Sequence, residues 1–486
     1  MTDIVFINPG DRKAVFQELG KNLTAIEPPF QIASYAAYLR NNGFSVAIID
    51  ANAENISPDE TAQKVKELNP LLTAIIVYGN QPSASTQNMS ISGKIVDAVK
   101  AGSDSCVVLG GLHASALPEQ TFEQENADFI IEGEEQIPLK ELLEHLKGEK
   151  KVSEVSGVWY QDNGETKHNP KPALIKDLDE YLPIAAWDLL PMAVYRAHNW
   201  HCFDDIENRQ PYAAIYTSLG CPYSCSFCCI NAPFGGSSLR CRSPELVVEE
   251  ITLLVEKYGI KNLKIIDEMF VLNENHYMKI VDLLIEKNFD LNIWAYARVD
   301  TVKEKTLKKL KQAGINWLAL GIESANADVR DGASKKMKPR DIAEIVNEIQ
   351  AAGIRVIGNF IFGLQDDTLA SMTETLTMAK ELNCEFANFY CAMAYPGSQL
   401  YTIALADHLK LPDEWTGYSQ HSYNIQPLPS KHLTAKEIVA FRDNAFHDYN
   451  ESDFYLSMLN DKFGLAVKEH MMEITQTRLK RAILDT

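Results

Sequence analysis

The stretch Leu219-Gly220-Cys221-Pro222-Tyr223-Ser224-Cys225-Ser226-Phe227-Cys228-Cys229 places four of the nine cysteines of this 486-residue chain within nine positions. It directly follows the apolar run 213–218, which has the length and composition of a buried β-strand. Gly220 and Pro222 keep the segment from continuing as a strand or a helix, so we predict a loop at the carboxyl end of that strand. Loops in this position carry the active sites of α/β folds.

The cysteines Cys221, Cys225 and Cys228 have the spacing C-x3-C-x2-C. Three thiolates at this spacing can converge on one face of a cubane [4Fe-4S] cluster and leave one iron without a protein ligand. An iron with an open position can chelate the amino and carboxylate groups of S-adenosylmethionine (SAM). The spacing therefore predicts an iron–sulfur centre, with these three cysteines as its metal ligands and as catalytic residues.

A structural zinc site is the alternative for clustered cysteines. It would use four protein ligands, commonly as two pairs of Cys or His. No second pair lies at a matching distance, because Cys241 is the nearest further candidate and Cys384 and Cys391 are isolated. The sequence therefore favours the cluster, and we expect Cys229 to be a small buried residue rather than a ligand.

Upstream of this segment, residues 1 to about 147 alternate between strand-like and helix-like patterns. The strand-like runs are 4–8, 46–50, 72–78, 106–110 and 128–131. Five strands with helical crossovers predict a doubly wound, Rossmann-like parallel sheet.

The cysteine segment itself belongs to a second alternating array. Its strand-like runs are 213–218, 263–267, 293–297, 317–322, 356–362 and 386–394. Six β/α units in succession predict a (β/α)6 barrel of the TIM type, complete or partial, with its site at the carboxyl ends of the strands.

These patterns divide the chain into four regions. We predict a parallel-sheet domain at 1–148, a linker with a small hairpin at 149–208, a barrel at 209–430 and a C-terminal helical region at 431–486. The hairpin is predicted from Asp162-Asn163-Gly164, because Asn and Gly supply the positive φ that its turn needs.

Composition and charge indicate which binding partners and which cellular location to expect. The formal net charge of −20 argues against a nucleic-acid partner, since phosphate binding needs clustered Lys and Arg. No apolar run approaches the roughly 20 residues of a membrane-spanning helix. The N-terminus lacks the basic region of a signal peptide, so we expect a cytoplasmic protein without a disulfide framework.

The cysteine motif after a barrel strand, preceded by a sheet domain, resembles the radical SAM superfamily, specifically its cobalamin-binding class, over about residues 10–445. In that superfamily one electron from the reduced cluster splits SAM into methionine and a 5′-deoxyadenosyl radical, which abstracts hydrogen from an unreactive carbon. The resemblance implies a small-molecule substrate and an external one-electron reductant such as flavodoxin or ferredoxin.

The resemblance also implies SAM contacts at the ends of the first three barrel strands. Phe227 corresponds to an aromatic residue that faces the adenine. Asp267 or Glu268 corresponds to a polar group that receives the SAM amine, as a carboxylate complements an ammonium group. Arg298 resembles the arginine that pairs with the SAM carboxylate.

Two later strands complete the SAM site that the resemblance implies. Glu323 and Ser324 end the fourth strand and correspond to the segment that contacts the ribose. Gly358, in the fifth strand, matches a pattern that lets the adenine approach the backbone.

In the N-terminal domain, the resemblance implies a site for the nucleotide tail of cobalamin, near a double glycine after the fourth strand. The implied contacts are Tyr78, Ser83, Gly110, Gly111 and His113. The loop 8–12 lacks the histidine of the Asp-x-His-x-x-Gly motif, so we expect a cobalt without a lower histidine ligand. The alternative is a nucleotide-type domain that holds no cofactor.

The two implied cofactors suggest a reaction in which the radical removes a hydrogen atom and methylcobalamin delivers a methyl group. Methylation of an unactivated carbon is the leading hypothesis. A cyclase or oxidoreductase related to the anaerobic magnesium-protoporphyrin monomethyl ester cyclases is the alternative, and a non-enzymatic cobalamin sensor is a remote one. The methylthiotransferase branch is disfavoured, because Cys106 is the only cysteine before position 202.

Overall fold

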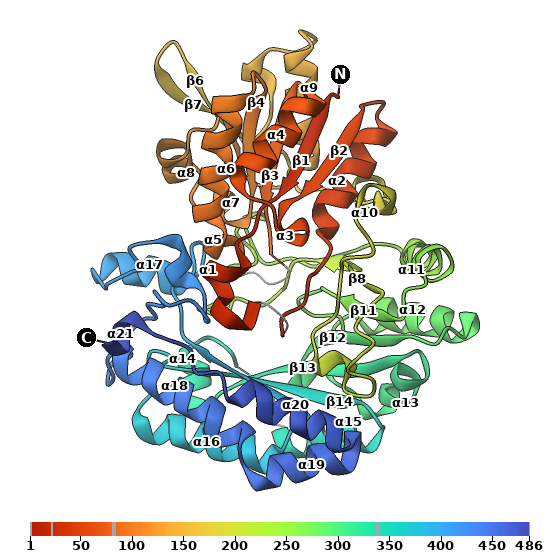
Figure 1. Cartoon of the computed structure of the whole chain (residues 1–486), viewed down its shortest axis with the longest axis vertical. Coiled ribbons are helices and arrows are strands. Elements are labelled where there is room, and N and C mark those ends of the chain that lie inside the picture. The colour runs from red at the N-terminus through yellow and green to blue at the C-terminus, as the bar shows by residue number, and fades with distance from the viewer. Residues whose placement is uncertain (1, 21–22, 80–83, 337–340, 486) are drawn as a thin grey trace.

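The computed structural model describes residues 2–20, 23–79, 84–336 and 341–485 (Figure 1). An N-terminal α/β domain lies above a second, six-stranded parallel sheet, and the C-terminal helices pack beneath that sheet (Figure 1). The α/β class with parallel sheets predicted from the sequence is confirmed.

The N-terminal sheet has the strand order β2-β1-β3-β4-β5-β6-β7, and its first five members are parallel. These five are β1 (Ile4–Asn8), β2 (Val46–Asp50), β3 (Leu72–Val77), β4 (Cys106–Gly111) and β5 (Phe129–Ile131). Helices cover both faces, as they must when strands are apolar on both sides. One core holds α2 (Phe30–Asn41) and α9 (Gln136–Leu146), and the other holds α4 (Pro58–Leu68) and α6 (Met89–Gly102).

Short helices follow the strands at the edge that faces the second sheet. They are α1 (Arg12–Phe16), α3 (Ala51–Glu54), α5 (Ala84–Gln87) and α7 (Leu112–Ala116), and α8 (Pro118–Gln124) then leads from α7 to β5. The doubly wound arrangement predicted for this region is therefore present.

The hairpin predicted in the linker is confirmed as β6 (Val158–Asp162) and β7 (Glu165–His168), with Asn163 and Gly164 at φ 52° and 84°. It does more than connect domains, because β6 pairs antiparallel with β5 and extends the N-terminal sheet. The rest of the segment includes α10 (Leu178–Tyr181), η3 (Trp187–Leu189) and η4 (Trp200–Cys202). Its aromatic residues Trp187, Tyr195 and Trp200 are buried in the core of the second domain, so this region is a packed part of the fold.

The second sheet has the order β15-β14-β13-β12-β11-β8, all parallel, and forms an open, partial barrel. Its strands are β8 (Tyr212–Ile215), β11 (Asn262–Ile265), β12 (Asn292–Arg298), β13 (Ile315–Glu323), β14 (Arg355–Phe362) and β15 (Phe386–Cys391). Its helices are α11 (Pro244–Tyr258), α12 (Glu274–Lys287), α13 (Glu304–Gln312), α14 (Ala327–Gly332), α15 (Ile342–Ala351), α16 (Leu369–Leu382) and α17 (Gln399–Ala406).

Local signals define these helices. The hydroxyl of Ser243 accepts a hydrogen bond from the Leu246 amide at 3.3 Å and caps α11, and Pro244 occupies the first turn, where its missing N–H costs nothing. The same helix ends at Gly259, whose φ of 66° is the left-handed conformation that glycine tolerates.

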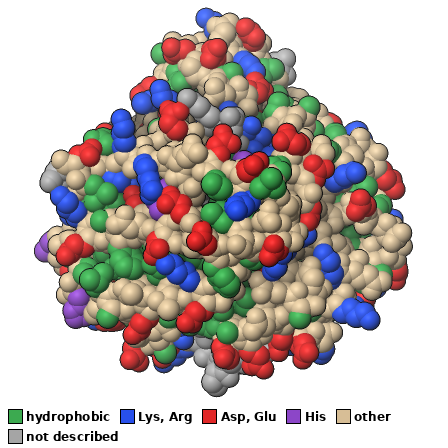
Figure 2. Space-filling view, turned by 60° about the horizontal axis from the view of Figure 1, so that its bottom comes forward, with side chains coloured by type: hydrophobic (Ala, Val, Ile, Leu, Met, Phe, Trp, Pro, Cys, Tyr) green, Lys and Arg blue, Asp and Glu red, His purple; other side chains and the backbone are tan. Residues whose placement is uncertain are grey.

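The C-terminal region is helical, as predicted. It contains α18 (Ala435–Asn450), α19 (Asp453–Phe463), α20 (Leu465–Thr475) and α21 (Ala482–Asp485), and η6 (Trp415–Tyr418) precedes it. Hydroxyls of Tyr449 and Tyr455 donate to the carbonyl oxygens of Cys384 and Glu385 at 2.8 and 3.1 Å, which fixes the helices to the start of β15. Acidic and basic side chains are interspersed over the face shown in Figure 2.

In the part of the chain that the structure describes, no helix combines the length and the apolar character needed to cross a membrane.

Candidate active site

The cysteine loop leaves the carboxyl end of β8 and is closed by a short antiparallel pair, β9 (Ser218–Leu219) and β10 (Arg240–Cys241). Gly220 has φ 84°, and a Cβ there would lie 2.5 Å from the carbonyl oxygen of Ser238, so only glycine fits. The Asn231 amide donates to the carbonyl oxygens of Cys221 and Tyr223 at 3.1 and 3.3 Å. Asn231 therefore holds the loop in shape, a role that no sequence signal indicated.

Cys221, Cys225 and Cys228 line one cavity at the carboxyl ends of the barrel strands. Burial raises the pKa of the Cys221 thiol to about 11 and that of Cys228 well above its usual range, so metal binding must displace protons from these thiols. Among the described residues, no three Cys, His, Asp or Glu side chains are close enough to hold a single metal ion together. Three thiols that line one cavity suit a cubane cluster, which takes one thiolate at each of three irons.

Cys229 also borders this cavity and is buried against Leu112 and Ile230. Its burial agrees with the expectation of a small packed residue.

The end of β12 brings Arg298 to the same cavity. Its guanidinium stacks over the ring of Tyr223 at 4.0 Å, donates to Asp300 Oδ1 at 2.9 Å and to the carbonyl oxygen of Lys336 at 2.7 Å. Contacts within the protein thus orient Arg298 beside the cysteine loop, which suits recognition of a carboxylate.

The two carboxylates at the end of β11 have different environments. Asp267 is fully buried and accepts hydrogen bonds from the Thr217 amide, the Thr217 hydroxyl and the Ser218 hydroxyl at 2.6, 2.5 and 2.6 Å. It joins the ends of β8 and β11 and does not line the cavity. Glu268 does line it, and burial raises its pKa to about 8.

The end of β13 separates Glu323 from Ser324 in the same way. Glu323 lines the cavity with φ 63° and forms a buried ion pair with Lys335, a residue that sequence reasoning missed. Ser324 is turned away, and its hydroxyl contacts the Thr375 hydroxyl at 3.1 Å and accepts from the Asn326 amide at 3.2 Å. A non-glycine residue with positive φ is uncommon and clusters at functional sites.

On β14, Gly358 faces away from the cavity. A Cβ on it would lie 2.8 Å from the Phe360 ring and 3.3 Å from Cys384 Sγ, so the position is tight against packed core atoms. Because side chains alternate along a strand, Asn359 and Ile361 on the opposite face of β14 line the cavity instead. Phe227 lines it too and packs against the apolar cluster that contains Ile361.

A second cavity, here called the inner cavity, lies between the carboxyl ends of the N-terminal strands and the interior of the barrel. Tyr78 lines it. Asn8, Arg12, Asn52 and Asn88 contribute polar groups, which suit the amide side chains of a corrin ring.

Of the other expected cobalamin contacts, Gly110, Gly111 and His113 line neither cavity. Gly111, at φ 117°, closes onto the backbone of Val77, and a Cβ on Gly110 would lie 3.1 Å from Glu135 and Ile76. His113 is buried, its Nδ1 lies 3.2 Å from Thr86 Oγ1, and burial lowers its pKa to about 3. Ser83 lies outside the described residues.

Glu135 organises this end of the sheet and was not foreseen. Its buried carboxylate accepts hydrogen bonds from the Tyr35 hydroxyl, the Tyr78 hydroxyl and the Gly111 amide at 2.9, 3.3 and 2.8 Å. Burial raises its pKa to about 7. Glu135 therefore fixes both the double-glycine turn and a residue of the inner cavity.

A buried cluster forms the barrel end of the inner cavity. Lys264 Nζ lies 3.2 Å from both oxygens of Glu27 and 4.6 Å from the centre of the Trp294 ring. The Tyr212 hydroxyl donates to Glu27 at 3.0 Å. Glu27 precedes α2, so this cluster ties the N-terminal region to the barrel.

The two cavities share five lining residues and are therefore adjacent. The shared side chains are Tyr296, Asn359, Tyr390, Tyr395 and Gln420. Three phenols and two carboxamides thus separate the cysteine-lined cavity from the inner cavity.

Comparison with known proteins agrees with this arrangement. A family model described as the radical SAM superfamily matches residues 215–379, and one described as a B12 binding domain matches residues 19–143. An uncharacterised methyltransferase of Pyrococcus horikoshii is 30% identical over 446 residues, which cover 91% of each chain. The anaerobic magnesium-protoporphyrin IX monomethyl ester cyclase of Cereibacter sphaeroides is 25% identical over 93% of this chain and 70% of its own length.

Two solved structures share the whole fold. The radical SAM methyltransferase TsrM of Kitasatospora setae, a structure with cobalamin and a [4Fe-4S] cluster bound, superposes with a TM-score of 0.70 at 16% identity and covers 98% of this chain and 99% of its own. The cobalamin-dependent radical enzyme OxsB superposes with a TM-score of 0.72 at 16% identity, over 98% of this chain and 72% of that one. At such identities the likeness concerns the fold alone.

Proposed function

The chain belongs to the cobalamin-binding class of the radical SAM superfamily, and from this premise we propose that it cleaves SAM reductively and methylates an unactivated carbon of a small-molecule substrate. The observation that carries the proposal is the pair of adjacent cavities. One is lined by the three cysteines and the other by the carboxyl ends of the N-terminal strands.

Cys221, Cys225 and Cys228 would hold the [4Fe-4S] cluster through their thiolates, in the barrel region 209–430. The inner cavity, with Tyr78 at its edge, would receive cobalamin from the sheet domain 1–148. When bound, the cluster with SAM supplies a 5′-deoxyadenosyl radical, and methylcobalamin supplies the methyl group.

The protein's own residues would orient SAM. Arg298, already aligned by Asp300 and Tyr223, would bind the SAM carboxylate. Glu268 would bind the amine, which favours the ionised carboxylate that burial alone disfavours. Glu323, held by Lys335, would accept from the ribose hydroxyls, and Phe227 would pack against the adenine.

We further propose an external one-electron reductant, such as flavodoxin or ferredoxin, to reduce the cluster. All nine cysteines are free, which suits a reducing compartment, and we propose the cytoplasm.

The likeness to a magnesium-protoporphyrin ester cyclase supports a second candidate, a cyclase or oxidoreductase with the same cofactors. The mass of the product separates the two candidates. Methylation adds one CH2, whereas cyclisation or oxidation removes hydrogen or adds oxygen.

The test is anaerobic reconstitution with iron, sulfide and hydroxocobalamin, followed by iron and cobalt counts and an assay for 5′-deoxyadenosine. We expect four irons and one cobalt per chain, and loss of both iron and deoxyadenosine in Cys225→Ala. Cys391→Ala is the matched control, because Cys391 borders the same cavity outside the motif. Iron without cobalt would remove methylation while leaving SAM cleavage, and deoxyadenosine formation that survives in Cys225→Ala would refute the cluster assignment.

A further inference from the structure

Gln420 occupies the boundary between the two cavities in an unusual way. Its side chain is buried, with 8% exposed, and it lines both cavities. Its Oε1 accepts from the Cys391 amide and its Nε2 donates to the Cys391 carbonyl, both at 2.9 Å. Because β15 is an edge strand, the Gln420 carboxamide takes the place of a neighbouring peptide group at the end of that strand.

The side-chain amide of Gln420 makes a further contact at the boundary between the cavities. Gln420 Nε2 lies 3.3 Å from the hydroxyl of Tyr395, another residue that borders both cavities. Gln420 thus fixes the end of β15 and a phenol of the boundary at once.

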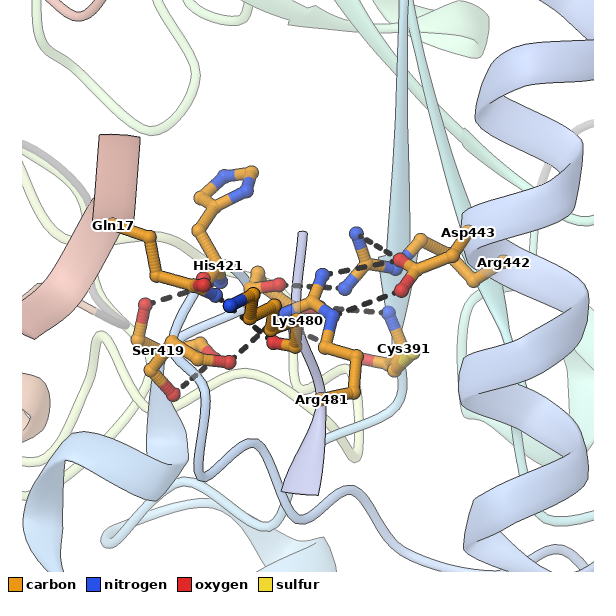
Figure 3. Close-up of polar contacts among 10 residues, drawn as sticks. Gln17, Cys391, Ser419, His421, Arg442, Asp443, Lys480 and Arg481 are labelled. Carbon is orange, nitrogen blue, oxygen red and sulfur yellow. Dashed lines mark hydrogen bonds and ion pairs between the residues drawn. The ribbon is translucent and has the colours of Figure 1, made fainter. Parts of the chain in front are cut away.

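Residues 419–423, here called the wall segment, are held from the C-terminal region by two buried arginines. Arg442 on α18 donates to the Gln420 carbonyl oxygen at 2.6 Å and pairs with Asp443 at 3.0 Å. Arg481, 1% exposed, donates to both oxygens of Asp443 at 2.8 and 3.1 Å and to the Ser422 carbonyl oxygen at 2.8 Å. Figure 3 shows Arg442, Asp443 and Arg481 side by side next to Cys391.

The N-terminal domain holds the wall segment from the other side. Gln17, at the end of α1, donates to the carbonyl oxygens of His421 and Lys480 at 2.7 and 3.1 Å (Figure 3). The Ser419 hydroxyl donates to the Val15 carbonyl oxygen at 2.8 Å. Val15 and His421 also line the inner cavity, so the wall segment joins both domains where that cavity closes.

Burying these charged side chains costs desolvation free energy, which is more than is needed if they only anchor a surface loop. Guanidinium groups buried away from water need both charge partners and full hydrogen bonding, and apolar packing often stabilises a fold as well. Here two arginines, Arg442 and Arg481, donate to the backbone of one short segment, and Asp443 pairs with both of them. The feature that distinguishes that segment is that it carries Gln420 into both cavities.

We propose that Gln420 is a positioning residue. It fixes the shared boundary so that a group bound in one cavity is aligned with its acceptor in the other, and Arg481, together with Arg442 and Asp443, holds Gln420 in place. This inference rests on the proposed function. The transfer concerned is that of the SAM methyl group to reduced cobalamin, which crosses the shared boundary. Reductive SAM cleavage uses the cysteine-lined cavity alone.

The two reactions release different products from SAM. In methyl transfer the S–CH3 bond breaks and its electron pair remains on sulfur, which gives S-adenosylhomocysteine. Cobalt(I) provides the electron pair of the new Co–CH3 bond and becomes cobalt(III). Reductive cleavage instead consumes one electron and yields methionine and, after hydrogen abstraction, 5′-deoxyadenosine. A low-potential reductant such as titanium(III) citrate provides the cobalt(I) and reduces the cluster, so both products can be measured without knowing the substrate.

The first experiment needs no cofactor. Hydrogen–deuterium exchange of the full chain is compared for wild type, Gln420→Met, Arg481→Ala and the matched control Arg478→Ala. Arg478 lies three residues before Arg481, is exposed and pairs with Glu451. We expect at least tenfold faster exchange of the Cys391 amide and of the wall segment in the first two variants only. Unchanged exchange in Arg481→Ala, or equal acceleration in Arg478→Ala, would contradict the holding role.

The second experiment measures both products with the reconstituted holoenzyme. We expect S-adenosylhomocysteine formation to fall roughly tenfold or more in Gln420→Met and Arg481→Ala, since small misplacements of reacting groups are costly, while 5′-deoxyadenosine formation stays within about twofold. Gln420→Met keeps the side-chain length and lacks the hydrogen bonds, which guards against simple misfolding. Equal loss of both products, or no loss of either, would overturn the positioning role. A wild-type protein that forms neither product would instead overturn the proposed function.

Discussion

Adjacent polar residues at the strand ends have opposite orientations, and this sets their expected roles. Asp267 and Ser324 are saturated by hydrogen bonds within the fold, whereas Glu268 and Glu323 border the cysteine-lined cavity. Variants of each pair therefore separate stability from ligand binding.

We predict that Asp267→Asn destabilises the fold and that Glu268→Gln weakens SAM binding. An amide at Asp267 turns a donor toward three donors, which should lower the free energy of unfolding by about 1–3 kcal/mol. Glu268→Gln replaces a carboxyl whose ionised form is disfavoured by burial, so the free energy of unfolding should stay unchanged or rise. The same variant should raise the Kd for SAM about tenfold, because the amide carries no charge to pair with the SAM amine. Urea denaturation and equilibrium dialysis measure the two effects, and the reverse assignment would contradict the orientation described.

Glu135 makes stability depend on pH. Its pKa rises from 4.5 to about 7 on burial, so the folded state keeps a proton that the unfolded chain has lost. The stability it contributes is fully present below about pH 4.5 and disappears as pH rises through about 7.

We therefore predict that Glu135→Gln flattens the pH profile. Between pH 5 and pH 8, wild type should lose up to about 3 kcal/mol more unfolding free energy than the variant. Urea denaturation across this range measures the difference. Parallel profiles would show that Glu135 does not keep its proton.

The sequence predicted which residue types gather at the strand ends, but not which neighbour faces the cavity. That choice depends on how the chain leaves each strand. The positive φ of Glu323 is an example, because no local signal announces it at a glutamate. Lys335, Asn231 and Glu135 were missed because each acts on a partner distant in sequence.

At the level of elements, strand patterns were readable because apolar runs alternate regularly with helices. Which strands pair with one another was harder to predict from the sequence. The hairpin β6–β7 was predicted, but its attachment to β5 depends on a tertiary contact that local residues do not encode. The turn from β4 to α7 shows a related case, because Gly110 packs closely against the side chains of Glu135 and Ile76 and Gly111 against the backbone of Val77.

We predict that Gly111→Ala lowers the free energy of unfolding by at least about 2 kcal/mol more than Gly43→Ala does. Both glycines have positive φ, which any alanine finds strained, but a Cβ at Gly111 would lie 2.3 Å from the Val77 carbonyl oxygen, and Gly43 has open space around it. Chemical denaturation of the two variants isolates the clash from the shared backbone strain. Equal losses would mean that the turn can relax.

Across the whole molecule, the N-terminal domain and the barrel are joined by buried contacts. Glu27 links the region before α2 to Lys264 on β11, and the aromatic residues of the connecting segment lie in the barrel core. The linker predicted from sequence therefore does not imply independent domains.

We predict that Glu27→Ala lowers the unfolding free energy by about 3–5 kcal/mol, because it removes a partner of the buried Lys264 ammonium. The double variant Glu27→Ala with Lys264→Met should recover much of that loss. The comparison uses urea denaturation monitored by tryptophan fluorescence. No recovery in the double variant would place the effect elsewhere in the cluster.

The meeting of α1 with the wall segment also constrains when the protein can mature. Gln17 and the His421 carbonyl oxygen that it contacts are 404 positions apart. At a ribosomal rate of about 5–20 residues per second, that interval lasts roughly 20–80 s. The inner cavity therefore stays incomplete until the wall segment has been synthesised. We expect stable insertion of cofactors to follow, late in biogenesis.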